Sequence, residues 1–428
     1  MGMFQWTERA AGVLQSGGVI APDERLPWAQ TGLMGVQHVI AMFGATVLAP
    51  ILMGFDPNLA IFMSGVGTLL FYFITGGQVP SYLGSSFAFI GVVIAATGYG
   101  GQGPNANLPV ALGAIIVCGL LYALIGALVN AVGTRWIERL MPPVVTGAVV
   151  AVIGLNLAAI PVKNMAASNF DSWMQLVTFV SVALVAVFAR GMVQRLLILV
   201  GLAIATLIYV LLANGLGLGK PMDFSGIANA AWVGLPRFTA PEFSGNAMLL
   251  IAPVALILVA ENLGHLKAVA AMTGRNLDPY IGRAFTADGV ATMISGAAGG
   301  TGVTTYAENI GVMAATRIYS TAVFVVAALM ALVLGFSPKF GALIQAIPLP
   351  VMGGVSIVVF GLITIAGARI WVDNKVDFSN PANLLTAAIT LILGTGDFTL
   401  KFGSFALGGI GTATFGAVLL HALLRRRA

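Results

Sequence analysis

The sequence predicts an all-α polytopic membrane protein, and two observations carry that prediction. Of the 428 residues, 58% are hydrophobic and only 8% are charged, with a mean hydropathy of +0.97, whereas soluble domains carry about 25% charged residues. No Lys, Arg, Asp or Glu occurs among the 78 residues from Pro57 to Thr134. These features exclude a soluble enzyme, a nucleic-acid-binding protein and a disordered chain.

Uncharged runs between turn residues predict fourteen transmembrane segments, because about 20 residues cross a bilayer as a helix. With a cytoplasmic N-terminus, fifteen Lys and Arg residues fall on the inner side and five on the outer side. The positive-inside rule therefore places both termini in the cytoplasm. The expected segments lie near 29–52, 59–75, 81–97, 109–131, 141–160, 172–189, 195–213, 246–266, 281–297, 302–316, 318–336, 349–368, 382–396 and 405–424.

Segments three and ten are rich in Gly, Ser and Thr, which is atypical of plain helices. We expect short extended strands near 82–86 and 302–306, paired antiparallel, each leading into a half-helix. Other motifs repeat too: Pro143–Gly147 resembles Pro350–Gly354, at an offset of 207 residues. Seven segments in each half give a 7+7 inverted repeat, an arrangement typical of alternating-access transporters.

Three acidic residues fall within the expected segments: Glu261, Asp288 and Glu308. An ionisable group at membrane depth costs at least roughly 2.5–3.5 kcal/mol, so each needs a function or a partner. Glu308 begins a half-helix, and a functional role is favoured for it and for Glu261. For Asp288, a hydrogen bond or ion pair between helices is favoured instead.

Two histidines stand near these groups in the sequence pattern. His265 lies one helical turn after Glu261 on the same face, and it either tunes the proton affinity of Glu261 or packs through a hydrogen bond. For His38, in the first segment, a hydrogen bond between helices is favoured over ligand contact.

The half-helix starts near Phe87 and Glu308 predict the chemistry of the ligand. Free backbone N–H groups at helix N-termini bind carbonyl oxygens or anions, but two carboxylates beside them repel an anion and accept ligand N–H groups. A neutral heterocycle with both C=O and N–H groups, such as a nucleobase, fits this pattern. The aromatic rings of Phe43, Phe87 and Tyr306 are candidates for stacking on it.

The sequence disfavours two other classes of function. An anion transporter on the same scaffold is disfavoured by Glu308, and an intramembrane enzyme by the lack of a catalytic or metal motif. The sequence therefore predicts a secondary active transporter without a cofactor or metal, and without a nucleic-acid partner. Its surroundings are the lipid bilayer, and its coupling ion is the proton, with sodium as the lesser alternative.

The sequence resembles the nucleobase–ascorbate transporter (nucleobase:cation symporter-2) family. Three motifs carry the resemblance: Glu308–Arg317, Gln37–His38 and Glu261–His265. The stretches Tyr82–Phe89 and Tyr306–Ala314 are most similar to bacterial uracil permeases of that family.

The resemblance implies a function and a set of site residues. The function is proton-coupled import of uracil across a bacterial inner membrane; the alternative is a xanthine, purine or other nucleobase. Position 307 is Ala where the similar permeases have Gly. The implied substrate-binding residues are Glu261, Glu308, Phe87, Ala307, Tyr306, Ala45 and Ser86, with Glu261 and His265 in proton coupling and Asp288, Asn309 and His38 in support.

The resemblance also implies a division into domains. A core domain comprises residues 29–134 and 214–336, and a gate domain comprises residues 135–213 and 337–424. Cytoplasmic tails span 1–28 and 425–428. The implied oligomer is a homodimer formed through the gate domain.

Overall fold

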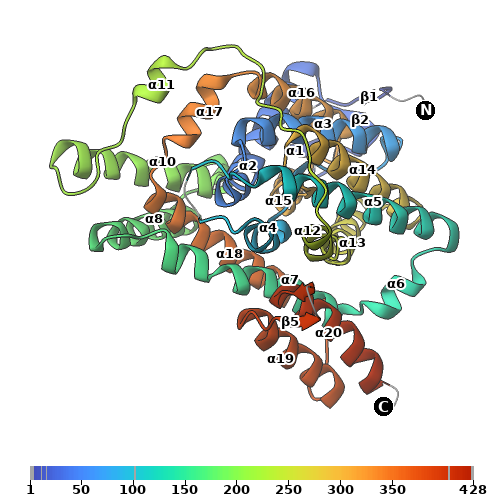
Figure 1. Cartoon of the computed structure of the whole chain (residues 1–428). Coiled ribbons are helices and arrows are strands. Elements are labelled where there is room, and N and C mark those ends of the chain that lie inside the picture. Colours follow the sequence, from blue (N-terminus) through green and yellow to red (C-terminus); the bar gives the residue numbers. More distant parts are fainter. Residues whose placement is uncertain (1–3, 11, 16, 101–102, 403–404, 426–428) are drawn as a thin grey trace.

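The computed structural model describes residues 4–425 except 11, 16, 101–102 and 403–404 (Figure 1). The described chain is overwhelmingly helical, as the composition predicts. The end of the expected basic C-terminal tail, 426–428, lies outside the described residues. The main helices are α2 (Trp28–Met53), α3 (Pro57–Ile74), α4 (Ile90–Thr97), α5 (Leu108–Val132), α7 (Pro143–Leu157), α8 (Asn169–Phe188), α10 (Leu197–Val210), α12 (Gly245–Ile251), α13 (Val254–Thr273), α14 (Ile281–Ala298), α15 (Ala307–Thr316), α16 (Thr321–Gly335), α17 (Pro338–Gln345), α18 (Leu349–Asp373), α19 (Pro381–Thr395) and α20 (Gly409–Leu424).

Short elements connect these helices. Several were not expected from the sequence, among them the strands near each terminus and four one-turn or two-turn helices. They are β1 (Thr7–Glu8), α1 (Gly12–Gln15), β2 (Glu24–Arg25), β3 (Leu83–Ser85), η1 (Phe87–Phe89), α6 (Arg135–Leu140), η2 (Ile160–Asn164), α9 (Gly191–Arg195), η3 (Leu211–Gly215), α11 (Ser225–Asn229), η4 (Asp278–Tyr280), β4 (Val303–Thr305), β5 (Leu400–Phe402) and β6 (Phe405–Leu407).

Eight described helical stretches are long and apolar enough to cross a membrane. A ninth is obtained if α16 and α17, which are bent by 84° at their junction, form one broken span. Residues 87–97, α19 and α20 are apolar but shorter. The chain is thus a helical multi-pass membrane protein, as expected, while the number fourteen stays a prediction.

Local chemistry explains where many helices begin and end. Proline occupies the first helical position of α3, α7, α17 and α19, where its missing N–H is not needed. The expected segment 246–266 lies within one apolar helical stretch, Gly245–Thr273, which is interrupted at Ala252 and Pro253 between α12 and α13. Proline inside a helix removes a hydrogen bond and clashes with the preceding turn.

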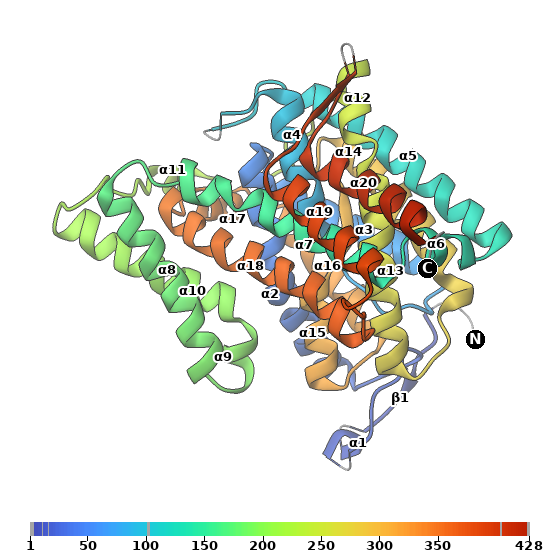
Figure 2. The ribbon, with the colours of Figure 1, turned by 90° about the horizontal axis from the view of Figure 1, so that it is seen from below.

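Glycines let the helices at the centre of the fold approach closely. A Cβ at Gly119 of α5 would lie 2.7 Å from the carbonyl oxygen of Gly289 on α14, so only a glycine permits this packing. Helix α3 packs against α14 and α16, and α7 packs against α18. Figure 2 shows α8, α9 and α10 as an arm to one side, with α19 and α20 packed together next to α7.

The N-terminal segment is anchored to helices far away in the sequence. Ile20 pairs with Ile318 directly after α15, and the Trp6 indole donates a 2.9 Å hydrogen bond to Thr321 at the start of α16. Asp23 forms an ion pair with Arg275 in the connection from α13 to α14. These contacts tie the segment before α2 to the end of the half-helix α15.

Candidate functional site

Two buried strands form the centre of the candidate site. β3 and β4 pair antiparallel, with Leu83 opposite Thr305 and Ser85 opposite Val303. The pairing extends at one end, where Tyr306 N–H donates to the Tyr82 carbonyl at 3.0 Å. The predicted pair of antiparallel strands in segments three and ten is therefore confirmed.

Threonine side chains hold each strand against a long helix. The N–H of Leu83 donates to Thr68 Oγ1 of α3 at 2.9 Å, and the N–H of Val303 donates to Thr292 Oγ1 of α14 at 3.2 Å. Two strands alone leave one backbone edge each without a partner, and these hydroxyls supply it. Sequence reasoning missed both threonines, although polar residues inside apolar segments are a usable signal.

Each strand leads directly into a helix. Ser86 is fully buried and caps η1, its hydroxyl accepting a 3.3 Å hydrogen bond from the Ala88 N–H. Tyr306 is the residue before α15, so that Ala307 and Glu308 form its first turn. The first N–H groups of a helix have no partner within it. Because β3 and β4 are antiparallel, the starts of η1 and α15 lie at opposite ends of this three-residue strand pair.

Helix α13 brings Glu261 to these half-helix starts. It packs against η1, β4 and α15, and the charges of Glu261 and Glu308 are close enough to interact. Both side chains are partly buried, and neither forms an ion pair among the described residues. Two acidic residues without a cationic partner among the described residues thus belong to helices that meet beside the half-helix starts.

Next to Glu261, Asn262 connects α13 to three other elements. Its side-chain oxygen accepts hydrogen bonds from Thr304 and Thr305 of β4. Its side-chain nitrogen donates to the Tyr122 hydroxyl of α5 at 2.6 Å and to Asp288 of α14. Asp288 is fully buried, and within the described part of the chain its second oxygen has no hydrogen-bond partner. The geometry gives Asp288 the helix-linking hydrogen bond that the sequence favoured.

His265 reaches the same network through β4. Its Nδ1 lies 2.8 Å from Thr305 Oγ1. The Thr305 hydroxyl donates to Asn262, an arrangement that favours a proton on His265 Nδ1. No hydrogen bond between His265 and Glu261 occurs among the described residues, and Nε2 is the nitrogen left for other contacts.

His38 and Asn309 form a separate buried contact. The Asn309 amide nitrogen lies 2.9 Å from His38 Nδ1 and donates to the His38 carbonyl at 3.1 Å. The His38 ring also packs on Phe324, with centroids 4.6 Å apart. The contact is the interhelical hydrogen bond that the sequence favoured for His38, and it fixes α15 against α2.

The aromatic residues are placed differently from one another. The Tyr306 ring covers Gly84, where a Cβ would lie 2.6 Å from Tyr306 Cε2, and its hydroxyl donates to the Ser85 carbonyl at 2.9 Å. Phe87 is partly buried, with its ring 6.1 Å from that of Phe360 on α18. The stacking expected of Phe43 is wrong: its ring faces Phe340 of α17, 5.5 Å away.

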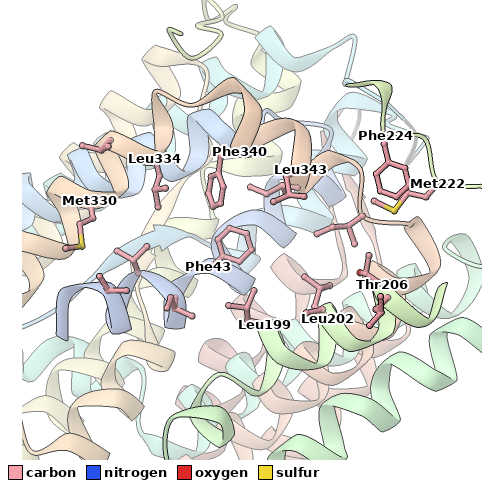
Figure 3. A pocket seen from close by; sticks show the side chains of 18 of the residues that line it. Phe43, Leu199, Leu202, Thr206, Met222, Phe224, Met330, Leu334, Phe340 and Leu343 are labelled. Atoms are coloured by element: carbon pink, nitrogen blue, oxygen red, sulfur yellow. The ribbon is translucent and has the colours of Figure 1, made fainter. Parts of the chain in front are cut away.

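Helix geometry explains that error. Phe43 and Ala45 differ by about 200° around α2, and Ala45, only 1% exposed, precedes Thr46, which donates to the Tyr306 hydroxyl at 3.2 Å. Phe43 instead lines an apolar cavity on another face of α2 (Figure 3).

Comparison with known families identifies the scaffold. A family model described as "Permease family" (Xan_ur_permease) matches residues 29–402. The chain belongs to the permease family. It is therefore a transport protein rather than an enzyme, as the sequence predicts.

Two curated relatives cover nearly the whole chain. The chain is 70% identical over 410 residues to "Putative pyrimidine permease RutG" of Escherichia coli (strain K12), covering 96% of this chain and 93% of the relative. It is 42% identical over 412 residues to "Uracil permease" of Paenibacillus larvae, covering 94% of this chain and 96% of the relative. The resemblance to the family of uracil permeases is confirmed.

Solved structures share the fold at low sequence identity. A structure of SLC26A9 aligns with a TM-score of 0.67 at 12% identity, covering 93% of this chain and 65% of that one. The transmembrane domain of a cyanobacterial bicarbonate transporter, BicA, aligns with a TM-score of 0.64 at 15% identity, covering 92% and 97%. The chain spans about two thirds of the SLC26A9 structure, and these likenesses concern the fold alone.

Proposed function

We propose that this chain imports a pyrimidine nucleobase, with uracil the leading substrate, together with a proton and by alternating access. The observation that carries the proposal is the pair of carboxylates, Glu261 and Glu308, beside two half-helix starts. The names of the two curated relatives, a pyrimidine permease and a uracil permease, support the same substrate class.

The proposed recognition uses complementary hydrogen bonds. The backbone N–H groups of Phe87 and Ala307 donate to the two carbonyl oxygens of the ring, and Glu261 and Glu308 accept from its N–H groups. Ala307 is exposed at the start of α15, so its methyl group borders the ligand while only its backbone binds. An anion in the same position would be repelled by both carboxylates, which disfavours the anion-transport alternative.

Reciprocal packing supports a seven-plus-seven inverted repeat. The contact of α2 with α16 has a counterpart in that of α12 and α13 with α5, and the contact of α8 with α18 has one in that of α19 with α7. Thr68 and Thr292 hold the two strands in the same way. In this proposal residues 29–134 and 214–336 form the core domain, and 135–213 and 337–424 form the gate domain.

The proton is proposed to travel on Glu261. A carboxylate surrounded by apolar protein is easier to protonate than one in water, and the membrane potential supplies about 2.3 kcal/mol per 100 mV for one inward charge. His265 is proposed to tune the proton affinity of Glu261. The hydrogen bond between His265 and Thr305 links His265 to β4, the strand proposed to lie beside the ligand. Asp288, Asn309 and His38 support the site by holding its helices.

The remaining parts of the proposal concern location and assembly. The chain is proposed to lie in a bacterial inner membrane with both termini in the cytoplasm, since the predicted topology puts fifteen basic residues inside and five outside. A homodimer through the gate domain is proposed from the family resemblance.

Competition for uptake tests the substrate. Purified protein in proteoliposomes, with an inward proton gradient, takes up radiolabelled uracil in the presence of excess unlabelled uracil, thymine, xanthine or sulfate. Strong competition by uracil, with little effect of xanthine and none of sulfate, is the expected result. Competition by sulfate, or xanthine outcompeting uracil, would contradict the proposal.

A further inference from the structure

A large apolar cavity lies away from the paired strands, among α2, α10, α16 and α17 (Figure 3). Its volume is about 1230 Å³. Phe43 of α2, Leu202 of α10, Met330 of α16 and Phe340 of α17 line it, and Met222 and Phe224 border one end. None of the residues proposed to bind the nucleobase lines it.

The chemistry of the walls restricts what the cavity holds. Its volume exceeds the roughly 300–1,000 Å³ of small-molecule sites, and nearly all its lining is hydrocarbon. A nucleobase or an anion would find almost no hydrogen-bond partner there, and apolar cavities exclude water. A long, flexible hydrocarbon chain fits both the size and the composition.

One polar atom interrupts the apolar wall. The hydroxyl of Thr206 on α10 is buried and, within the described part of the chain, has no hydrogen-bond partner. Threonine in a helix commonly donates to the carbonyl one turn earlier. A ligand that offers an acceptor, such as an ester carbonyl, would satisfy this donor.

Two lysines flank the cavity along the chain. Lys220 stands two residues before Met222, and Lys339 directly precedes Phe340. Neither forms an ion pair with any described residue, although Lys339 lies over the Trp232 ring, 4.7 Å from its centroid. The charge pattern places both lysines on the outer side of the membrane, where a lipid phosphate could meet them.

We propose that this cavity binds an anionic phospholipid. One acyl chain lies in the cavity, an ester carbonyl accepts from Thr206, and the phosphate lies near Lys220 and Lys339. The lipid contacts both domains of the proposed transporter, because α2 and α16 belong to the core domain and α10 and α17 belong to the gate domain. The domain assignment and the outer-side position of the two lysines rest on the proposed function; lipid binding itself does not.

Photolabelling tests the proposal. The purified full chain in vesicles of phosphatidylethanolamine and phosphatidylglycerol is irradiated with a trace of phosphatidylglycerol carrying a diazirine on one acyl chain. Labelled peptides are then mapped by mass spectrometry. Labels are expected on α10, α16 and α17 at cavity-lining positions, with phosphatidylglycerol preferred over phosphatidylcholine.

Matched variants make the result specific. Ala203→Trp places an indole inside the cavity, whereas Ile204→Trp places the same ring on the neighbouring exposed position of α10, which does not line it. Labelling should fall in the first variant, because the bulky ring obstructs the acyl chain, and stay unchanged in the second. Thr206→Val, a milder change, should lower labelling while thermal unfolding confirms the fold.

The headgroup contact has its own test. Replacing both lysines, as Lys220→Gln with Lys339→Gln, should reduce the preference for phosphatidylglycerol about tenfold. Equal labelling in Ala203→Trp and Ile204→Trp, or an unchanged headgroup preference, would each overturn the proposal. Since the assay contains no uracil, its outcome is independent of the transport substrate.

Discussion

The substitution Glu308→Gln isolates the charge that the proposed site needs most. It keeps the size of the side chain but replaces a carboxylate by an amide, which can present its own N–H to the ligand N–H. Glu308 lies in the first turn of α15 and forms no ion pair with a described residue. The loss therefore falls on the ligand contact rather than on a salt bridge.

The magnitude follows from the kind of bond removed. A hydrogen bond to a charged group contributes about 1.5–3 kcal/mol, which corresponds to roughly one to two decades in dissociation constant. The repulsion between Glu261 and Glu308 is also relieved, so the fold should not be destabilised.

Equilibrium binding measures the effect. Radiolabelled uracil binding to the purified variant is compared with that of Glu242→Gln, the same change on an exposed connecting segment. We expect the first to lose about tenfold or more in affinity and the second to bind as the parent does. Binding within twofold of the parent in Glu308→Gln would refute the assignment.

Three further substitutions test the surroundings of the site. His265→Ala should retain uracil binding and equilibrium exchange but lose uphill uptake, measured on one preparation across pH 5 to 8; uphill uptake with an unchanged pH profile would leave His265 a packing residue only. Asn262→Leu leaves buried hydroxyl and carboxyl groups unpaired, at about 1–3 kcal/mol each, so its thermal unfolding temperature should fall by several degrees; an unchanged temperature would argue against the network. Gly84→Ala should abolish uracil binding, because its Cβ would collide with the Tyr306 ring, whereas Gly311→Ala has open space around it and should fold and bind normally; equal behaviour of both would contradict the packing.

Composition and motif spacing predicted the part of the fold that depends on local chemistry. The long apolar runs became helices, and the Gly-, Ser- and Thr-rich stretches at Pro80–Phe87 and Gly299–Asn309 became paired strands and half-helices. The break at Pro253 was predictable in principle, because proline disfavours a continuous helix, but apolar residues on both sides obscured it.

Features set by tertiary contacts could not be predicted in the same way. The hydrogen bonds of Asn262 join residues from α5, α14 and β4 that lie far apart in the sequence. Phe43 illustrates the same limit, since an aromatic residue in an apolar helix gives no sign of which neighbour it faces. The cavity beside it depends on where four helices leave space, which no single segment encodes.

Uracil-induced proton entry tests the central claim most directly. Proteoliposomes that enclose a pH-sensitive dye, with no initial pH gradient and with the membrane potential held negative inside, are supplied with uracil in sodium-free buffer. The account predicts that the interior acidifies as radiolabelled uracil accumulates, and that Glu261→Gln abolishes both signals. Accumulation of uracil without acidification, or only when sodium is added, would contradict proton-coupled import.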